Sequence, residues 1–181
     1  MDVDYNPEKL KELILYISNK ARGWGAGFGK TKLVAILFYS DFAAYRELGG
    51  PITGVPYIRL DFGPYPDGLE LAKHALVANG DAESDRTYGS ASPLGQILPR
   101  RPVKAELFAA DELAIVDRIM AWMQPMDATE LSRLSHDEPG YMLTEPLAVI
   151  PYATAVVAKR TLTPDDIAHG QELAEKLGLL A

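Results

Sequence analysis

The spacing of hydrophobic residues predicts a mainly helical protein. In six stretches, apolar side chains return every three or four positions, which places them on one face of an α-helix. Helix-capping residues mark several ends, such as Asn6-Pro7 before the first stretch and Gly49-Gly50-Pro51 after the second. The predicted helices are 7–22, 30–48, 67–79 and 111–123, one that begins at Asp127, and one over 163–177.

Three of these helices have informative details. The helix over 30–48 is apolar around most of its circumference, as expected of a helix packed on several sides. Asp127 and Glu130 form a capping box that marks a helix start. In the helix over 67–79 we expect Asp67 to cap the N-terminus and four side chains to point inward, namely Leu71, Ala72, Ala75 and Leu76.

Short stretches with alternating polarity predict a small amount of β-structure. Residues 57–62 alternate in polarity and are flanked on both sides by prolines and glycines that form turns. They are therefore predicted to form a strand with a turn at each end and with Ile58, Leu60 and Phe62 on one face. A second short strand is expected at 148–150. Residues 81–104 are polar and lack a clear period, which predicts a long loop with one short strand pair around Tyr88 and Ile97.

Together these elements predict the fold class mainly α (α+β): a single-domain helical bundle of about six helices with a small antiparallel β element. The elements show neither a βαβ rhythm nor an internal repeat. At 181 residues the chain is long enough for one hydrophobic core of its own, so we expect one domain over 1–181.

Composition and charge narrow the functional classes. The chain carries a formal net charge of -7, which disfavours nucleic acid and anionic lipid as partners and favours a basic protein surface. It has no cysteine, so disulfides, thiolate metal sites and a cysteine nucleophile are excluded. No apolar stretch is long enough for a membrane span and the first residues do not form a signal peptide, which predicts a cytoplasmic protein.

Motifs that would indicate catalysis are incomplete. The segment 23–31 ends in Gly-Lys-Thr like a phosphate-binding loop, but Trp24 stands where the pattern needs glycine and a helix precedes it. No Gly-x-Ser-x-Gly motif or paired histidine spacing for a metal occurs. His136 has two adjacent carboxylates, so a small hydrolase stays an alternative, although a structural or partner-contacting role is favoured. We therefore expect no enzyme activity, no cofactor and no metal.

Aromatic residues gather in the proline-rich segment after the second helix. Tyr57, Phe62 and Tyr65 lie close together there. Aromatic side chains on a stiff loop offer a large contact area at a small entropic cost, which suits a protein interface. The equally weighted alternative is that they seal one end of the bundle.

A DNA-binding regulator of the helix-turn-helix type is the main alternative function. The helices 111–123 and the one beginning at Asp127 are joined by a short turn, as in that motif. The recognition helix would carry one arginine, Arg133, against Asp127 and Glu130, whereas DNA readers need a basic surface. Binding to nucleic acid is therefore not expected.

Four stretches in this order resemble the SocA-like antitoxins, also described as the Panacea domain, a domain of phage-associated proteins. They are Thr31–Asp41 with Tyr45, Pro51–Gly54 with Tyr57, Phe62–Pro66, and Leu134–Pro139. The resemblance covers most of the chain. Two positions depart from the family pattern: Phe62 stands where a tyrosine is expected before Gly-Pro, and Tyr141 lies near a common tryptophan.

The resemblance implies an antitoxin that neutralises a co-encoded protein toxin by direct binding. In one branch of the family it implies an adapter that delivers the toxin to a protease. The identity of the toxin does not carry over, because the family pairs with many unrelated toxins. Combined with the aromatic segment, the resemblance leads us to expect partner-binding roles for Tyr57, Phe62, Tyr65, Ser135, His136, Asp137 and Glu138.

Overall fold

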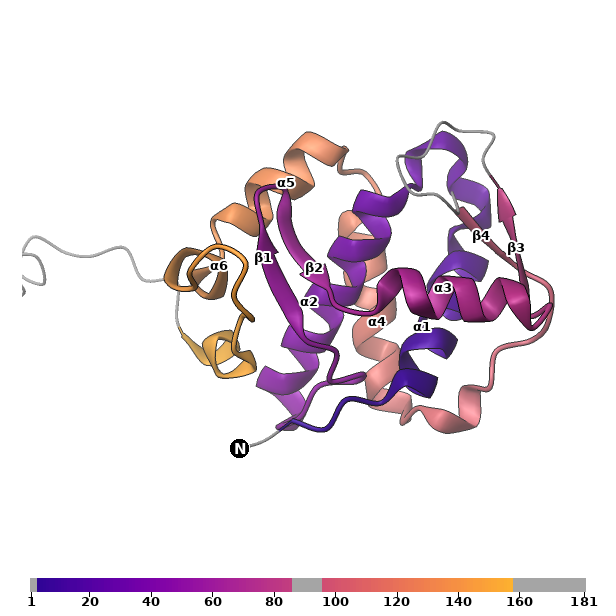
Figure 1. Ribbon diagram of the computed structural model, residues 1–181, viewed down its shortest axis with the longest axis horizontal. Coiled ribbons are helices and arrows are strands. Elements are labelled where there is room, and N and C mark those ends of the chain that lie inside the picture. Colours follow the sequence, from indigo (N-terminus) through magenta and orange to yellow (C-terminus); the bar gives the residue numbers. More distant parts are fainter. Residues whose placement is uncertain (1–2, 86–95, 158–181) are drawn as a thin grey trace, which may run out of the picture.

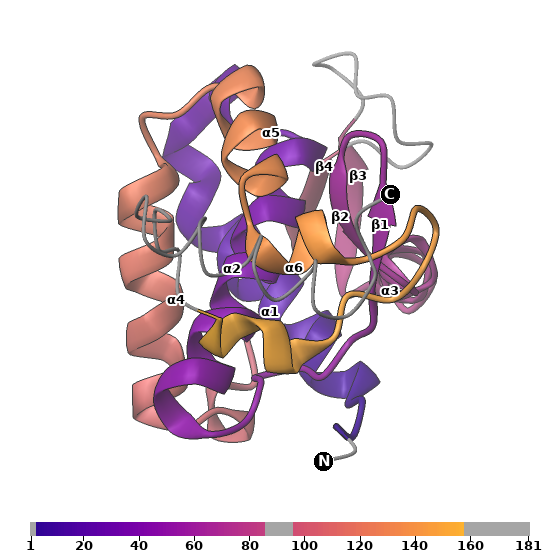
Figure 2. The ribbon, with the colours of Figure 1, turned by 90° about the vertical axis from the view of Figure 1, so that its left-hand side faces the viewer.

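Helix α2 (Lys30–Leu48) is the element around which the other elements pack in the computed structural model (Figures 1 and 2). The structure describes residues 3–85 and 96–157. The elements that contact α2 are helices α1 (Pro7–Lys20), α4 (Ala110–Met123) and α5 (Ala128–His136), strand β2 (Gly63–Pro66) and the 3-10 helix η3 (Tyr152–Val156). Most of the circumference of α2 is buried, including the 0% exposed Ile36, Leu37 and Ala44. The prediction of a central helix over 30–48 is thus confirmed.

Capping residues mark three of the helix ends. Asn6 accepts a hydrogen bond from the Lys9 amide at 3.0 Å and begins α1, and Asp127 accepts one from the Glu130 amide at 2.8 Å and begins α5. Gly49 ends α2 in the left-handed region at φ 83°. The other helices are α1 (Pro7–Lys20), α3 (Leu69–Ala78), α4 (Ala110–Met123), α5 (Ala128–His136) and α6 (Pro139–Leu143), with 3-10 helices η1 (Ala21–Gly27), η2 (Ala105–Leu107) and η3 (Tyr152–Val156).

Two antiparallel hairpins complete the described fold. Strand β1 (Tyr57–Leu60) pairs with β2 (Gly63–Pro66), and β3 (Ala82–Asp85) pairs with β4 (Gln96–Pro99). The predicted strand at 148–150 is a single antiparallel bridge between Ile58 and Val149. The observed class is mainly α with a small antiparallel β element, as predicted. No helix in the described ranges is long and apolar enough to cross a membrane.

Three details differ from the sequence prediction or lie outside the structure. The segment 63–66 is a strand rather than a turn, because two prolines occupy positions that need few ladder hydrogen bonds in a two-stranded sheet. Helix α3 begins after Gly68, which has a φ of 92°, and not after Asp67. Leu71, which was predicted to point inward, is exposed, because the buried face of α3 is formed by Leu69, Ala72, Lys73 and Leu76. The predicted helix over 163–177 and Tyr88 fall outside the described residues.

A buried carboxylate joins α2 to the segment that leads into β1. Asp41 is 0% exposed and accepts hydrogen bonds from the Thr53 amide at 2.7 Å, the Thr53 hydroxyl at 2.6 Å and the Tyr57 hydroxyl at 2.8 Å. Burial raises the pKa of Asp41, and the hydrogen bonds from Thr53 and Tyr57 oppose this rise. The network fixes the start of β1 relative to the central helix.

The Asp41 network predicts a large loss of stability on truncation. Asp41→Ala leaves three buried donors without their acceptor, and each such donor costs about 1–3 kcal/mol. We expect the free energy of unfolding to fall by about 3 kcal/mol or more, measured by urea denaturation. Asp4→Ala is the matched control at an exposed aspartate. A loss below about 1 kcal/mol for Asp41→Ala would show that the network is not a main support.

Candidate functional site

The turn between β1 and β2 presents one large apolar side chain to solvent. Leu60 pairs with Gly63, so Asp61 and Phe62 form the tip of the hairpin. Phe62 is 88% exposed, the highest value among the large hydrophobic residues that the structure describes. Gly63 follows at φ 119°, a conformation that favours glycine, and returns the chain into β2.

The C-terminal end of α5 holds this tip from behind. His136 Nε2 lies 3.1 Å from the Asp61 carbonyl oxygen, and because a carbonyl only accepts, Nε2 carries the hydrogen. The Ser132 hydroxyl donates to the Phe62 carbonyl at 3.4 Å. Ser135 packs so closely on Gly63 that an added Cβ would lie 2.7 Å from its hydroxyl. The tip is therefore a supported, defined surface.

Helix α6 fastens the same hairpin along β1. The Tyr141 hydroxyl donates to the Leu60 carbonyl at 2.9 Å, and the Tyr141 ring stacks on His136 with 4.7 Å between ring centroids. The Arg59 guanidinium lies 4.7 Å from the centroid of the Tyr141 ring and donates to the Thr144 carbonyl. These contacts tie the hairpin to α5 and α6 at several independent points.

The segment after α6 runs beside β1 and contains a strained leucine. The Leu147 amide donates to the Arg59 carbonyl and the Arg59 amide to the Ala148 carbonyl, both at 2.9 Å. A hydrogen bond from Ala148 to Glu145 closes a turn with Pro146 second and Leu147 third. Leu147 has φ 65°, where glycine or asparagine is usual, and is 75% exposed. The edge hydrogen bonds hold this leucine outward.

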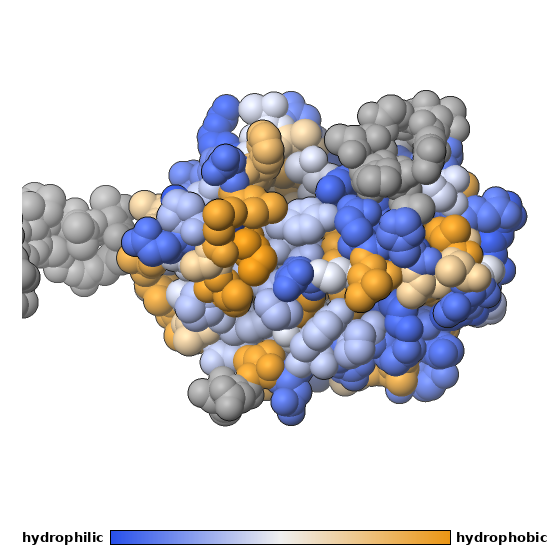
Figure 3. Space-filling model, in the orientation of Figure 1, coloured by the Kyte–Doolittle hydropathy of each residue, from blue (hydrophilic) through white to orange (hydrophobic). Residues whose placement is uncertain are grey.

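Exposed apolar side chains lie at the hairpin tip, on α6 and in the segment beside β1. We call the set Phe62, Met142, Leu143, Leu147 and Val149 the hairpin patch; each of these residues is more than half exposed. Figure 3 shows apolar surface over β1 and the neighbouring segment on this face of the molecule. Several large apolar side chains on one face of a protein mark an interaction surface more often than single exposed ones do.

The structure brings together only some of the residues expected to bind a partner. Phe62, Ser135 and His136 meet at or behind the tip, with Ser135 buried, whereas Asp137 is exposed at the C-cap of α5. Tyr57 is 0% exposed and lies in the aromatic core beside Phe38, Phe42 and Tyr152, so it has no accessible surface.

Tyr65 faces away from the tip, toward α2 and α3. Its hydroxyl donates to Glu70 at 3.0 Å, and the Lys30 ammonium lies 4.8 Å from the centroid of its ring. Burial and the Glu70 carboxylate raise the pKa of Tyr65. Tyr65 therefore supports the base of the hairpin.

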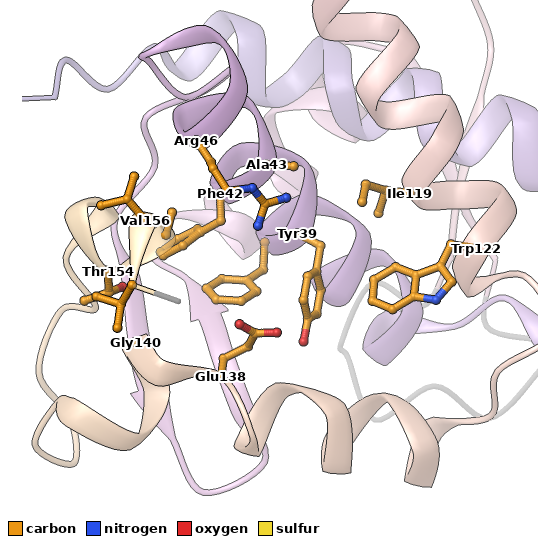
Figure 4. A pocket seen from close by; sticks show the side chains of 13 residues that line it. Tyr39, Phe42, Ala43, Arg46, Ile119, Trp122, Glu138, Gly140, Thr154 and Val156 are labelled. Atoms are coloured by element: carbon orange, nitrogen blue, oxygen red, sulfur yellow. The ribbon is translucent and has the colours of Figure 1, made fainter. Parts of the chain in front are cut away.

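Glu138 belongs to a different feature, a groove of about 490 Å³ between α2, α4, η3 and the α5–α6 turn (Figure 4). Aromatic side chains from α2 and α4 form much of its wall, including Phe38, Tyr39, Phe42 and Trp122. Sequence reasoning missed the groove because its walls come from distant segments. The only signal was that α2 is apolar on more sides than one core requires.

Three alternative functions gain no support from the geometry: phosphate binding, metal binding and DNA reading. The glycine-rich segment follows α1 and forms the 3-10 helix η1, whereas a phosphate-binding loop follows a strand. Within 3–85 and 96–157, no three His, Asp or Glu side chains are grouped to hold a metal ion. The exposed Arg133 of α5 is accompanied by two exposed carboxylates, Glu130 and the N-cap residue Asp127, so the outer face of this helix is not basic.

One protein family matches the sequence over most of these elements. The model of the family described as antitoxin SocA-like, Panacea domain, matches residues 33–141. This range contains the first hairpin, α5, and the walls that α2 and α4 contribute to the groove. No curated protein matches the chain.

The packing behind the tip predicts that Gly63 is sensitive to substitution. Gly63→Ala places a Cβ 2.7 Å from the Ser135 hydroxyl and keeps a φ of 119° that alanine disfavours. We expect the free energy of unfolding to fall by about 2 kcal/mol. Gly50→Ala is the matched control, since nothing lies within 4 Å of its added Cβ. Equal thermal midpoints for the two variants would contradict close packing of the tip on α5.

Proposed function

Because the chain belongs to the family of SocA-like antitoxins with the Panacea domain, we propose that it neutralises a cognate protein toxin by binding it directly through the hairpin patch. The observation that carries this proposal is Phe62, an almost fully exposed aromatic side chain on a supported turn. Burying such a side chain contributes about 1.5–3 kcal/mol. In the free protein Phe62 is exposed and this contribution is absent, whereas a complex in which Phe62 is buried gains it.

Preorganisation of the tip supports a binding role. Contacts from Ser132, Ser135 and His136 fix the backbone of the turn before any partner arrives. Binding of a partner therefore restricts little loop motion, so less conformational entropy is lost and the affinity is higher. Aromatic anchors surrounded by smaller apolar contacts are typical of interface hot spots.

The charge around the patch favours a basic partner. Asp61, the neighbour of Phe62 in the chain, is exposed, and the whole chain carries a net charge of -7. Acidic rim residues attract a basic protein and speed its association at low ionic strength. We therefore expect basic residues on the toxin surface around the site that contacts Phe62.

The proposal assigns the protein a non-catalytic role. His136, the histidine that a hydrolase would need, donates through Nε2 to the Asp61 carbonyl and stacks on Tyr141. It thereby supports the tip. Neutralisation by this mechanism needs only the surface of the folded protein.

Co-expression tests the proposed function. The protein encoded by the neighbouring reading frame is expressed alone and together with this chain, growth is followed, and the complex is isolated by affinity purification. Growth arrest that this chain relieves, with a stable complex, is the expected result. A neighbour that arrests growth without forming a complex contradicts neutralisation by direct binding.

Removing the Phe62 side chain should weaken that complex selectively. We expect Phe62→Ala to raise the dissociation constant at least tenfold, as measured by isothermal titration calorimetry, because the main anchor is lost. The thermal midpoint should stay within about 2 °C, since the side chain is exposed. Leu71→Ala is the matched control on α3, at a leucine that is also exposed. Equal affinity of the two variants would remove Phe62 from the interface.

Leu147 gives a second test in which stability and binding move differently. Leu147→Gly removes the strain of a left-handed leucine, about 1–2 kcal/mol, and part of this gain is offset by the greater freedom of glycine in the unfolded chain. We expect the thermal midpoint to stay equal or rise while toxin affinity falls several-fold. A lower midpoint would show that the exposed leucine supports the fold itself.

A further inference from the structure

The groove between α2, α4 and η3 has a wall and a rim of large apolar side chains (Figure 4). Trp122 of α4 is 43% exposed, and the Tyr39 ring of α2 meets it edge to face, with 5.5 Å between the ring centroids. At the rim, Val156 and Val157 are 63% and 45% exposed. Exposed apolar side chains that share one groove mark an interaction surface.

The described part of the chain ends at the rim of this groove, at a point that packing holds in place. The Tyr152 hydroxyl of η3 donates to the Val55 carbonyl at 2.7 Å, and the Tyr152 ring lies 4.8 Å from the Phe42 ring. Thr154 packs so closely on Gly140 of α6 that an added Cβ would overlap with its hydroxyl. Residues 158–181 therefore continue from a fixed position beside the groove.

The sequence of this last segment predicts a helix with one apolar face. Over 163–177, Ile167, Ala174 and Leu177 return at helical spacing, and Leu173 lies at the edge of the same face. A helix of about 15 residues is only marginally stable in water by itself. Such a helix depends on an apolar surface against which it can pack its apolar face.

The length of the segment fits the groove. A helix of 15 residues is about 22 Å long, and α4, with 14 residues, is about 21 Å long. The five residues 158–162 reach at most about 18 Å. The predicted helix can therefore begin near Val157 and run along the groove beside α4.

We infer that residues 163–177 bind in the groove of their own chain as a helix, with the apolar face against the aromatic wall and over Trp122. This contact supplies α2 with a further neighbour on a side that its apolar circumference leaves for packing. The family match ends at residue 141, before η3 and the last segment, and so does not assign this contact. The inference does not depend on the proposed toxin binding.

The first test measures how well Trp122 is covered. In the full-length Trp24→Phe variant, fluorescence reports Trp122 alone, because the chain has two tryptophans. Adding Leu173→Ser and Leu177→Ser removes most of the apolar face. We expect the acrylamide quenching constant of Trp122 to rise about twofold or more, because the helix loses its contact with the groove.

The matched control changes the opposite face of the same helix. Glu172→Ser with Lys176→Ser also introduces two serines and leaves the net charge unchanged. We expect the quenching constant of this control to equal that of the Trp24→Phe parent. A urea transition as cooperative as that of the parent, in both double variants, separates loss of the contact from unfolding. Equal quenching constants in the two double variants would overturn the inference.

The second test identifies the occupant of the groove directly. The chain has no cysteine, so Arg46→Cys, at an exposed side chain that lines the groove, allows one benzophenone maleimide to be attached. After irradiation and trypsin digestion, we expect a cross-link to the peptide 161–176 within monomeric protein, and its loss when Leu173→Ser and Leu177→Ser are added.

The other products of the cross-linking experiment would each overturn the inference. Cross-linked dimers would show that a second copy, or a segment exchanged between two copies, fills the groove. Cross-links confined to residues before 158 would show that the last segment lies elsewhere. Either result leaves the proposed toxin binding to its own test by co-expression.

Discussion

The buried Asp41 carboxylate is the interaction on which the interaction surface depends. It lies on the central helix and holds Thr53 and Tyr57, so it sets where β1 begins. The position of the hairpin tip therefore depends on this network. A carboxylate without a cationic partner is an expensive way to join two segments, because burial opposes its charge. It is also a directional one, since a lost donor cannot be replaced by a small shift in packing.

The α5–α6 turn couples two surface features that differ in chemistry. On one side His136 holds an apolar tip, and on the other Glu138 lines an aromatic groove with an acidic edge. A partner that covered both would meet a hydrophobic anchor and an aromatic groove in a fixed relative position.

The helices could be predicted from local patterns in the sequence. The burial of single side chains and the groove could not, because they depend on packing between distant segments. The frame of α2 and the start of α5 follow from periodicity and capping, which involve neighbours in the chain. The burial of Tyr57 does not follow from local patterns, because it depends on Asp41 and on Tyr152, which is far away in sequence. Phe62 could be proposed as a contact from its proline-rich setting. The groove could not, since it exists only when α2, α4 and η3 are brought together.

Leu147 also has a consequence for how this protein would change under selection. Its backbone conformation costs free energy in every molecule, bound or free, and glycine would remove that cost by a single substitution. A library screened only for heat resistance should therefore enrich changes at this position early. A library screened for protection of cells should retain the leucine. The position would then separate the two selections, and it would show how much stability the fold gives up to keep an apolar side chain directed outward.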